Sequence, residues 1–347
     1  MIATAAAPDH RSATTPNVLI SGSLAFDYIM TFPGSIKDHI LPDKVHVLSV
    51  SFLFDSLRRH RGGVAGNIAY NLALLGEPAT VVGAGGSDFG SYRVAFDGLG
   101  IDTHLVLDVP DEFTGTAFMI TDLANNQVAG FFPGASFRAE DISVVEPARA
   151  SRVGLVGATA AGAMRRHAAE IATACPLIYD PSQQVVGLSA DDLRAGIDVA
   201  WAVIGSDYEF AVMEQKTGLS VAALTERLPL TVVTFGDQGS ELRSGGRVVR
   251  VPAVPAAPLA DPTGGGDAYR AGLLKGLLLG FDLELCGRMG AMTATYAIER
   301  HGTQEHAFGA NEFVGRFERS FPEFSGSLSE ALLSCPAPAA GPVTLPT

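Results

Sequence analysis

The sequence contains few cysteines and few basic residues, and each shortage excludes a class of protein. Its three cysteines, Cys175, Cys286 and Cys335, lie far apart and form no Cys-x-x-Cys pair. They indicate neither a disulfide framework nor a zinc site, and they suit a reducing cytoplasm. The 24 Lys and Arg residues are outnumbered by 37 Asp and Glu residues, and the resulting net charge of -13 argues against a nucleic-acid partner.

Long apolar runs and several common phosphate-binding motifs are also missing. The most apolar window covers residues 273–281, and Lys275 interrupts it. It is too short to cross a bilayer, so we expect a cytoplasmic protein without a membrane partner. No Gly-Lys-Ser/Thr sequence supports a P-loop kinase, and Asp88 occupies the last glycine position of an otherwise dinucleotide-like stretch.

The two ends differ in composition from the rest of the chain. Residues 1–16 are rich in Ala, Thr and Pro and predict a disordered tail. Residues 323–347 are rich in Pro, Ala and Ser and predict a second, mostly disordered tail. The chain of 347 residues is 47% hydrophobic, enough for a large core. No linker is evident between the tails, so we expect one domain over residues 17–322.

Short apolar runs alternate with segments of helical spacing along most of that domain. Strands are expected at residues 17–21, 79–82, 153–156, 177–179, 199–204 and 230–235. Helices are expected at residues 65–75, 92–99, 164–173, 208–217 and 221–227. This alternation predicts an α/β fold, with a parallel sheet covered by helices on both faces.

Two segments, residues 26–50 and 113–132, interrupt this alternation. The second contains alternating residues and a polar turn at Asn125 and Asn126, which is typical of a β-hairpin. Both segments follow elements of the main sheet. We therefore expect them to pair into a small separate sheet inserted into the domain.

The most informative motif is Asp-Pro-Thr-Gly-Gly-Gly-Asp at residues 261–267, followed by a helical pattern. Gly264, Gly265 and Gly266 can turn backbone N–H groups toward one point, and a helix N-terminus attracts anions. An acid in such a place suits proton abstraction from an attacking hydroxyl, and Asp267 is the candidate general base. The alternative is that Asp267 only caps the helix.

A second glycine-rich motif, Arg-Gly-Gly-Val-Ala-Gly-Asn at residues 61–67, lies upstream. Gly62 and Gly63 allow a substrate to approach the backbone closely. Asn67 offers a donor and an acceptor to vicinal hydroxyls. Taken alone, the stretch could equally be a glycine-rich turn before a helix.

The two motifs, in this order, resemble the two signatures of the PfkB, or ribokinase-like, family, and the resemblance covers about residues 17–322. These enzymes phosphorylate a sugar or nucleoside hydroxyl with ATP. The resemblance implies a ribokinase-like core with a small β-sheet lid over the substrate. It also implies that Asp267 is the catalytic base, that Gly264, Gly265 and Gly266 form the anion hole, and that Gly62, Gly63 and Asn67 bind the substrate.

The resemblance implies further site residues. Asp27 matches an aspartate that binds two sugar hydroxyls, although an exposed loop acid would look the same. Glu209 matches the glutamate of an Asn-x-x-Glu motif that organises Mg²⁺ and ATP through water. Ser206 replaces the asparagine of that motif, and the two residues could instead form a helix capping box.

Thr234, Gly236 and Gly239 resemble a stretch that lies along the nucleotide in this family, although a hairpin turn would have a similar sequence. Residues 38–43, 61–67, 122–127 and 301–306 resemble bacterial and archaeal adenosine (nucleoside) kinases. This likeness implies ATP- and Mg²⁺-dependent phosphorylation of the 5′-hydroxyl of a purine nucleoside, most simply adenosine to AMP. A sugar kinase for fructose, ribose or a relative, and a non-catalytic nucleoside-binding protein, are the alternatives.

Three further expectations concern ligands and assembly. Phe131 and Phe132 end the expected hairpin and point to opposite faces, and Phe132 is expected to contact the base. The alternative is that both rings pack within the lid or at a dimer interface. A monovalent cation is a further candidate cofactor. The protein is expected to be a monomer or a homodimer that binds only small molecules.

Overall fold

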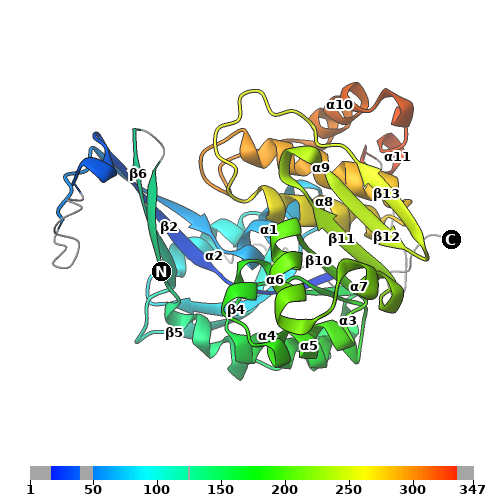
Figure 1. Ribbon diagram of the computed structural model, residues 1–347, viewed down its shortest axis with the longest axis horizontal. Coiled ribbons are helices and arrows are strands. Elements are labelled where there is room, and N and C mark those ends of the chain that lie inside the picture. The colour runs from blue at the N-terminus through cyan, green and yellow to red at the C-terminus, as the bar shows by residue number, and fades with distance from the viewer. Residues whose placement is uncertain (1–16, 40–49, 124–125, 334–347) are drawn as a thin grey trace, which may run out of the picture.

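The computed structural model describes residues 17–39, 50–123 and 126–333 (Figure 1). The predicted tail at residues 1–16, the expected turn residue Asn125 and the thiol of Cys335 lie outside the described residues. None of the helices in the described part of the chain is both long and apolar enough to cross a membrane.

The core is a nine-stranded sheet in the order β13-β12-β11-β10-β9-β8-β1-β4-β5. The strands from β11 to β5 are parallel, and β12 and β13 add an antiparallel edge. The bounds are β1 (Val18–Ser21), β4 (Thr80–Gly86), β5 (Asp102–Val109), β8 (Val153–Val156), β9 (Leu177–Tyr179), β10 (Ala202–Ser206), β11 (Leu230–Thr234), β12 (Ser240–Ser244) and β13 (Arg247–Val251). The central strands are short apolar runs buried on both faces, as parallel strands usually are.

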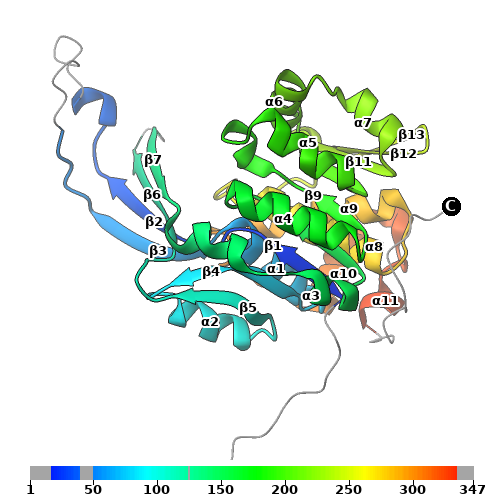
Figure 2. The ribbon, with the colours of Figure 1, turned by 90° about the horizontal axis from the view of Figure 1, so that it is seen from below.

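Helices cover both faces of this sheet (Figure 2). One face packs against α1 (Val64–Leu74), α2 (Gly90–Asp97), α8 (Gly265–Leu278), α9 (Leu283–Ile298) and α10 (Ala310–Ser320). The other face packs against α3 (Val145–Ala150), α4 (Ala161–Ala172), α5 (Ala190–Val199), α6 (Asp207–Thr217) and α7 (Val221–Arg227). Short 3-10 helices occupy Ile36–His39, Gly134–Asp141, Ser182–Val186, Gly236–Gln238 and Pro322–Phe324. The predicted α/β class is confirmed.

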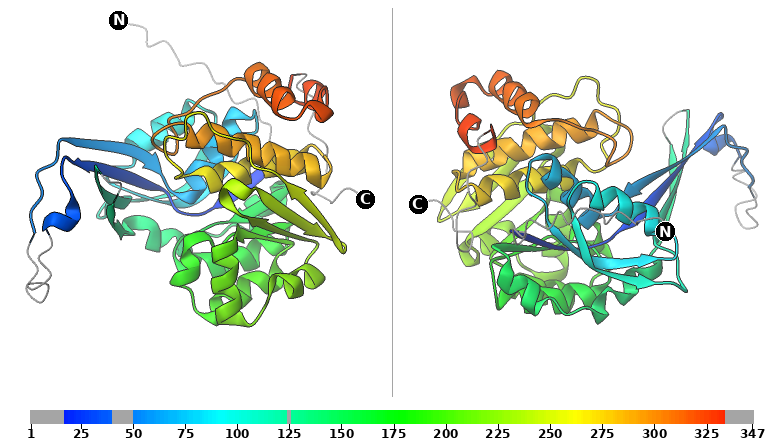
Figure 3. Two further views of the ribbon diagram at one scale, coloured as in Figure 1. Left: turned by 45° about the horizontal axis from the view of Figure 1, so that its top comes forward. Right: turned by 180° about the vertical axis from the view of Figure 1, so that it is seen from behind.

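A separate four-stranded sheet projects from the body of the molecule (Figure 3). Its strand order is β3 (Ser56–Gly62), β2 (Ala25–Phe32), β6 (Gly115–Asp122) and β7 (Gln127–Phe132). The β6–β7 hairpin of this sheet was predicted. The other segment predicted for the sheet, residues 26–50, is wrong at its end, because the sheet also contains β3. That strand reads Ser-Leu-Arg-Arg-His-Arg-Gly and lacks apolar alternation. Its Arg59 guanidinium instead lies 3.5 Å above the Phe26 ring.

Two other boundaries differ from the prediction. A strand was expected at residues 199–204, but the observed strand β10 starts three residues later, at Ala202, because Val199 is still the last residue of α5. The expected disordered tail from residue 323 contains α11 (Ser329–Leu333), and Leu328 before it is buried in the main core. A single buried leucine in a Ser- and Gly-rich stretch is too weak a signal to see in the sequence. Residues 334–347 lie outside the described part.

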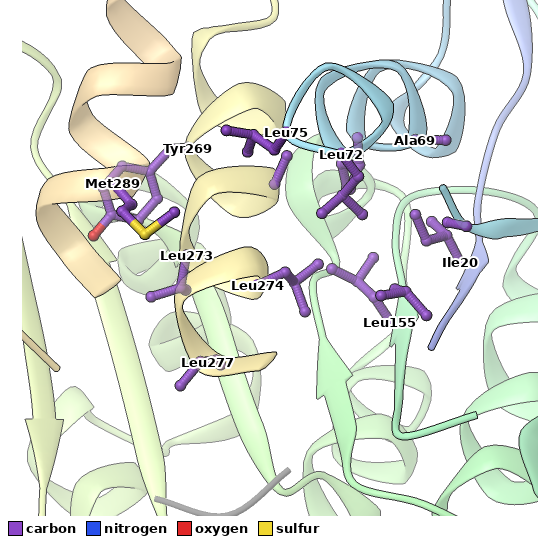
Figure 4. Packing of buried hydrophobic residues seen from close by; sticks show 14 of the residues in the cluster. Ile20, Ala69, Leu72, Leu75, Leu155, Tyr269, Leu273, Leu274, Leu277 and Met289 are labelled. Atoms are coloured by element: carbon purple, nitrogen blue, oxygen red, sulfur yellow. The ribbon is translucent and has the colours of Figure 1, made fainter. Parts of the chain in front are cut away.

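Helix α8 is the best-buried helix beside the site, and glycines let it approach its neighbour. Leu273, Leu274 and Leu277 of α8 pack in one cluster with Leu72 of α1 (Figure 4). On the side facing α9, a Cβ added at Gly272 would lie 2.4 Å from the Met289 carbonyl oxygen. The two helices can therefore be this close only because residue 272 has no side chain.

This packing predicts that Gly272→Ala is destabilising, since the new methyl group would force α8 and α9 apart. We expect a loss of about 1–3 kcal/mol in the free energy of unfolding. Gly90→Ala is the matched control, because a Cβ at this helical position meets no atom within 4 Å. Urea unfolding should place the control within about 1 kcal/mol of wild type. Equal midpoints for the two variants would contradict the packing argument.

Candidate active site

The predicted site residues gather at the carboxyl edge of the parallel sheet, where open α/β sheets bind ligands. Ser206 and Thr234 are register partners at the ends of β10 and β11. Asp180 follows the end of β9. Asp27 lies in β2, which continues from β1 after a three-residue connection. The topology thus brings together segments that are far apart in the sequence.

The N-terminus of α8 supplies the anion-binding element. Gly264 is the N-cap residue and has a φ of 80°, a left-handed conformation that glycine adopts without strain. The helix starts at Gly265, within the glycine run, whereas the sequence predicted a helical pattern only after Asp267. The backbone N–H groups of Gly266 and Asp267 donate to no acceptor among the described residues. They are therefore available to an anionic group, and the helix dipole favours one there.

Asp267 lies in the first turn of α8 and is half-buried. The Asn67 amide donates a hydrogen bond of 2.8 Å from Nδ2 to Asp267 Oδ2. Burial raises the pKa of the Asp267 carboxyl above its usual value, while Arg270 and the Asn67 amide oppose that rise and Glu209 adds to it. No described residue donates a hydrogen bond to Oδ1 of Asp267. The carboxylate thus has one anchored oxygen and one free oxygen.

One arginine lies beside two further acids next to this base. Arg270 is almost fully buried and forms an ion pair with Asp180, including a 2.6 Å bond from Nη2 to Oδ1. Its guanidinium is also 3.8 Å from Glu209. Burial raises the pKa of Asp180 to about 7 despite Arg270. A Cβ at Gly266 would lie 2.8 Å from Arg270 Nη1, so the guanidinium is immediately beside the anion-binding loop.

Asp27 faces the start of α1. A Cβ at Gly62 would lie 2.3 Å from Asp27 Oδ2, so glycine is required beside this carboxylate. Burial raises the pKa of Asp27 to about 6, His60 lowers it, and Asp261 and Asp267 raise it further. The site therefore concentrates negative charge opposite the free N–H groups of α8. His60 pairs with Asp27 across β2 and β3, and sequence reasoning did not identify it as a site residue.

Asn67 is fixed by a buried polar network that the sequence did not predict. Thr303 Oγ1 and Gln304 Nε2 lie 2.7 Å and 3.1 Å from Asn67 Oδ1. Gln304 Nε2 also donates to the Tyr92 hydroxyl at 2.8 Å. A Cβ at Gly66 would lie 2.0 Å from that hydroxyl, so this glycine makes room for the network. In the sequence, only the resemblance of residues 301–306 to nucleoside kinases pointed to this part of the site.

Ser206 and Glu209 form the capping box that the sequence offered as an alternative. Glu209 Oε2 accepts from the Ser206 amide at 2.7 Å, and Ser206 Oγ accepts from the Glu209 amide. Among the described residues no three His, Cys, Asp or Glu side chains cluster as a metal site. Mg²⁺ bound mainly by phosphate oxygens and water needs only one or two carboxylates. Glu209, which lies near both Arg270 and the anion-binding loop, fits that requirement.

The other predicted nucleotide-binding residues have separate structural roles. Thr234 Oγ1 is 3.5 Å from the Gly205 carbonyl oxygen. Gly236 and Gly239 have positive φ angles in the turn between β11 and β12. A Cβ at Gly239 would lie 2.1 Å from the Val251 carbonyl oxygen, whereas one at Gly236 meets nothing within 4 Å. Gly239 is thus needed for the turn, and Gly236 leaves open space at the sheet edge.

Strand register decides which lid phenylalanine shares a face with Asp27. Asp27 is the partner of Ala117 in β6, and Ala117 is the partner of Phe131 in β7. Paired residues in a sheet point to the same face, so Phe131 lies on the Asp27 face. Phe132 is the partner of Thr116 and lies on the opposite face. Both phenylalanine side chains are exposed.

Comparisons with known proteins show which family the chain is similar to. A model described as pfkB family carbohydrate kinase matches residues 33–307. A nucleoside kinase of Methanothermobacter thermautotrophicus is 32% identical over 306 residues, covering 87% of this chain and 95% of the relative. The structure of Burkholderia thailandensis nucleoside kinase in complex with inosine has a TM-score of 0.80 and 36% identity, covering 88% of this chain and 98% of that chain.

The same Burkholderia thailandensis kinase in complex with ADP-inosine has a TM-score of 0.78 and 38% identity, covering 88% of this chain and 96% of that chain. The family model spans most of the sequence. The matched residues include both glycine-rich motifs and the network residues Thr303 and Gln304. The chain therefore belongs to the pfkB family of carbohydrate kinases.

Proposed function

We propose that the protein transfers the terminal phosphoryl group of ATP to the 5′-hydroxyl of a purine nucleoside, with adenosine to AMP as the expected reaction. One observation carries the proposal: Asp267 lies in the same helical turn as two free backbone N–H groups and keeps a free carboxylate oxygen. The nucleoside kinases among the relatives support a nucleoside over a free sugar.

Each residue has a distinct task in this reaction. Glu209 and the edge formed by Ser206 and Thr234 would hold ATP and Mg²⁺; ATP would supply the phosphoryl group, and the metal would neutralise part of the phosphate charge. Asp27 accepts hydrogen bonds from the 2′- and 3′-hydroxyls of the ribose. Asp267 then takes the proton of the 5′-hydroxyl as that oxygen attacks. The amides of α8 stabilise negative charge on the group in transfer.

Asp267 tests the chemistry most directly. Asp267→Asn keeps the size and the Asn67 contact but removes the base, so we expect kcat to fall by roughly 10²–10⁴ with nucleoside binding nearly intact. Asp282→Asn is the matched control, because Asp282 Oδ1 caps the adjacent helix α9 and asparagine caps equally well. Steady-state kinetics with adenosine would refute the role if Asp267→Asn kept more than about a tenth of wild-type turnover.

Asp27 makes nucleoside binding dependent on pH. A carboxylate binds a diol through acceptor oxygens, and protonation replaces one acceptor by a donor. Because the pKa of Asp27 is raised to about 6, we expect nucleoside affinity to be full above that pH and to fall below it. Calorimetry of adenosine binding from pH 5 to 8 checks this, with Asp27→Asn as the variant that should bind weakly and without pH dependence. A flat wild-type profile would contradict the assignment.

Phe131 rather than Phe132 is the ring that we now propose for the base, because only Phe131 shares the Asp27 face. Stacking of a base on an aromatic ring contributes about 1–3 kcal/mol. Phe131→Ala should therefore weaken adenosine binding by roughly 5- to 150-fold and leave ribose binding unchanged. Phe132→Ala is the matched control on the opposite face. Loss of affinity in Phe132→Ala alone, or equal losses for ribose, would contradict this placement.

A further inference from the structure

The orientation of the Asn67 amide decides whether a hydrogen-bond donor or an acceptor faces the carboxylate of Asp267. An amide presents an oxygen acceptor on one side and an NH₂ donor on the other. In the observed orientation the NH₂ group faces Asp267, at 2.8 Å. In the reversed orientation the amide oxygen would face the carboxylate, and two acceptors would repel each other. The structure must therefore contain something that excludes the reversed orientation.

Gln304 has its own orientation fixed from two sides. Its Oε1 lies 3.3 Å from Nε of Arg61, and a guanidinium can only donate. Its Nε2 lies 2.8 Å from the Tyr92 hydroxyl, whose proton goes to the Gly62 carbonyl oxygen at 2.8 Å. Burial raises the pKa of Tyr92, so that proton stays in place. Both contacts require Oε1 of Gln304 toward Arg61 and Nε2 toward Tyr92.

The same Nε2 group then fixes Asn67. It donates to Asn67 Oδ1 at 3.1 Å, which leaves Nδ2 of Asn67 facing Asp267. Thr303 cannot do this alone, because its hydroxyl also lies 3.0 Å from the Arg61 carbonyl oxygen and has one proton for two acceptors. With its proton on that carbonyl, the hydroxyl could accept from a reversed Asn67. Gln304 is therefore the decisive donor.

We propose that Gln304 is a positioning residue for phosphoryl transfer, which acts through the Asn67 amide to hold Asp267 with one oxygen anchored and the other free. This inference rests on the proposed function of Asp267. Gln304 is 2% exposed, Asn67 4% and Tyr92 0%, so water does not compete for these bonds. Arg61 and Gly62, at the end of β3, set the direction of the hydrogen bonds in this network, so this end of the small sheet is connected to Asp267 through Gln304 and Asn67.

Gln304→Glu is the sharpest test, because it preserves shape but replaces the donor by an acceptor. The carboxylate is stabilised by Arg61 and accepts from Asn67, which reverses the amide. Loss of a hydrogen bond to a charged group predicts a fall in kcat of about 10- to 100-fold. The KM values for adenosine and ATP should stay within about threefold of wild type, since both ends of the Asn67 amide already bond protein groups and the diol-binding Asp27 is unchanged. Gln304→Met removes the donor without imposing reversal and should lose less.

Tyr70→Phe is the matched control. The Tyr70 hydroxyl donates to the carbonyl oxygen of His306, so this variant removes an anchor of the same loop without touching the Asn67 amide. Its kcat should equal that of wild type, and thermal unfolding reports whether each variant is folded. A kcat of Gln304→Glu above about a third of wild type, a loss confined to KM, or an equal kcat loss in Tyr70→Phe overturns the proposal.

A readout that needs no turnover separates this inference from the proposed function. In ¹⁵N-asparagine-labelled protein, the Asn67 side-chain NH₂ resonance, assigned with Asn67→Asp, reports its bond to Asp267. We expect Gln304→Glu to shift it in the same direction as Asp267→Ala, which removes the acceptor, whether or not the protein phosphorylates a nucleoside. An unchanged resonance in Gln304→Glu overturns the positioning role even in an active kinase. If the variants show the expected shifts but the wild-type protein phosphorylates no nucleoside, only the proposed function is contradicted.

Discussion

The hydrogen bond from Asn67 to Asp267 joins the starts of two helices, and the site depends on it. It requires α1 and α8 to begin at the same edge of the sheet, which the buried leucines shared by the two helices ensure. It also requires glycine at residue 66, where a side chain would displace Tyr92. The two glycine-rich motifs are thus a single structural unit, although they are 200 residues apart at this contact.

Electrostatics shape the rest of the site. Three carboxylates, those of Asp180, Glu209 and Asp267, lie around one buried guanidinium, that of Arg270, and Asp27 adds a fourth carboxylate that interacts with Asp267. Burial raises the pKa of Asp27 to about 6 and that of Asp180 to about 7, and neighbouring carboxylates add to both rises. Removing one partner of a buried ion pair usually costs several kcal/mol, so the arginine cannot be dispensable. Its position beside Gly266 keeps positive charge where an anionic group binds.

The sequence predicted the parts of this molecule that have a local signature. The α/β core followed from alternating apolar runs, and the Asp267 motif followed from glycines before a helix. Features that depend on distant partners were missed. Strand β3 is rich in arginine and lacks apolar alternation, and Arg59 packs on Phe26. Gln304 gains its role only from contacts with Arg61, Asn67 and Tyr92, and strand register, invisible in the sequence, separates Phe131 from Phe132.

Identification of the phosphorylated product tests the proposed reaction most directly. The purified wild-type protein is incubated with ATP, Mg²⁺ and either a purine nucleoside or ribose, and the products are analysed by ³¹P NMR. The proposal predicts a nucleoside 5′-monophosphate, formed faster than any ribose phosphate because only the nucleoside offers a base to the lid. A product phosphorylated at another hydroxyl, a preference for ribose, or ATP consumption that nucleoside does not stimulate would contradict it.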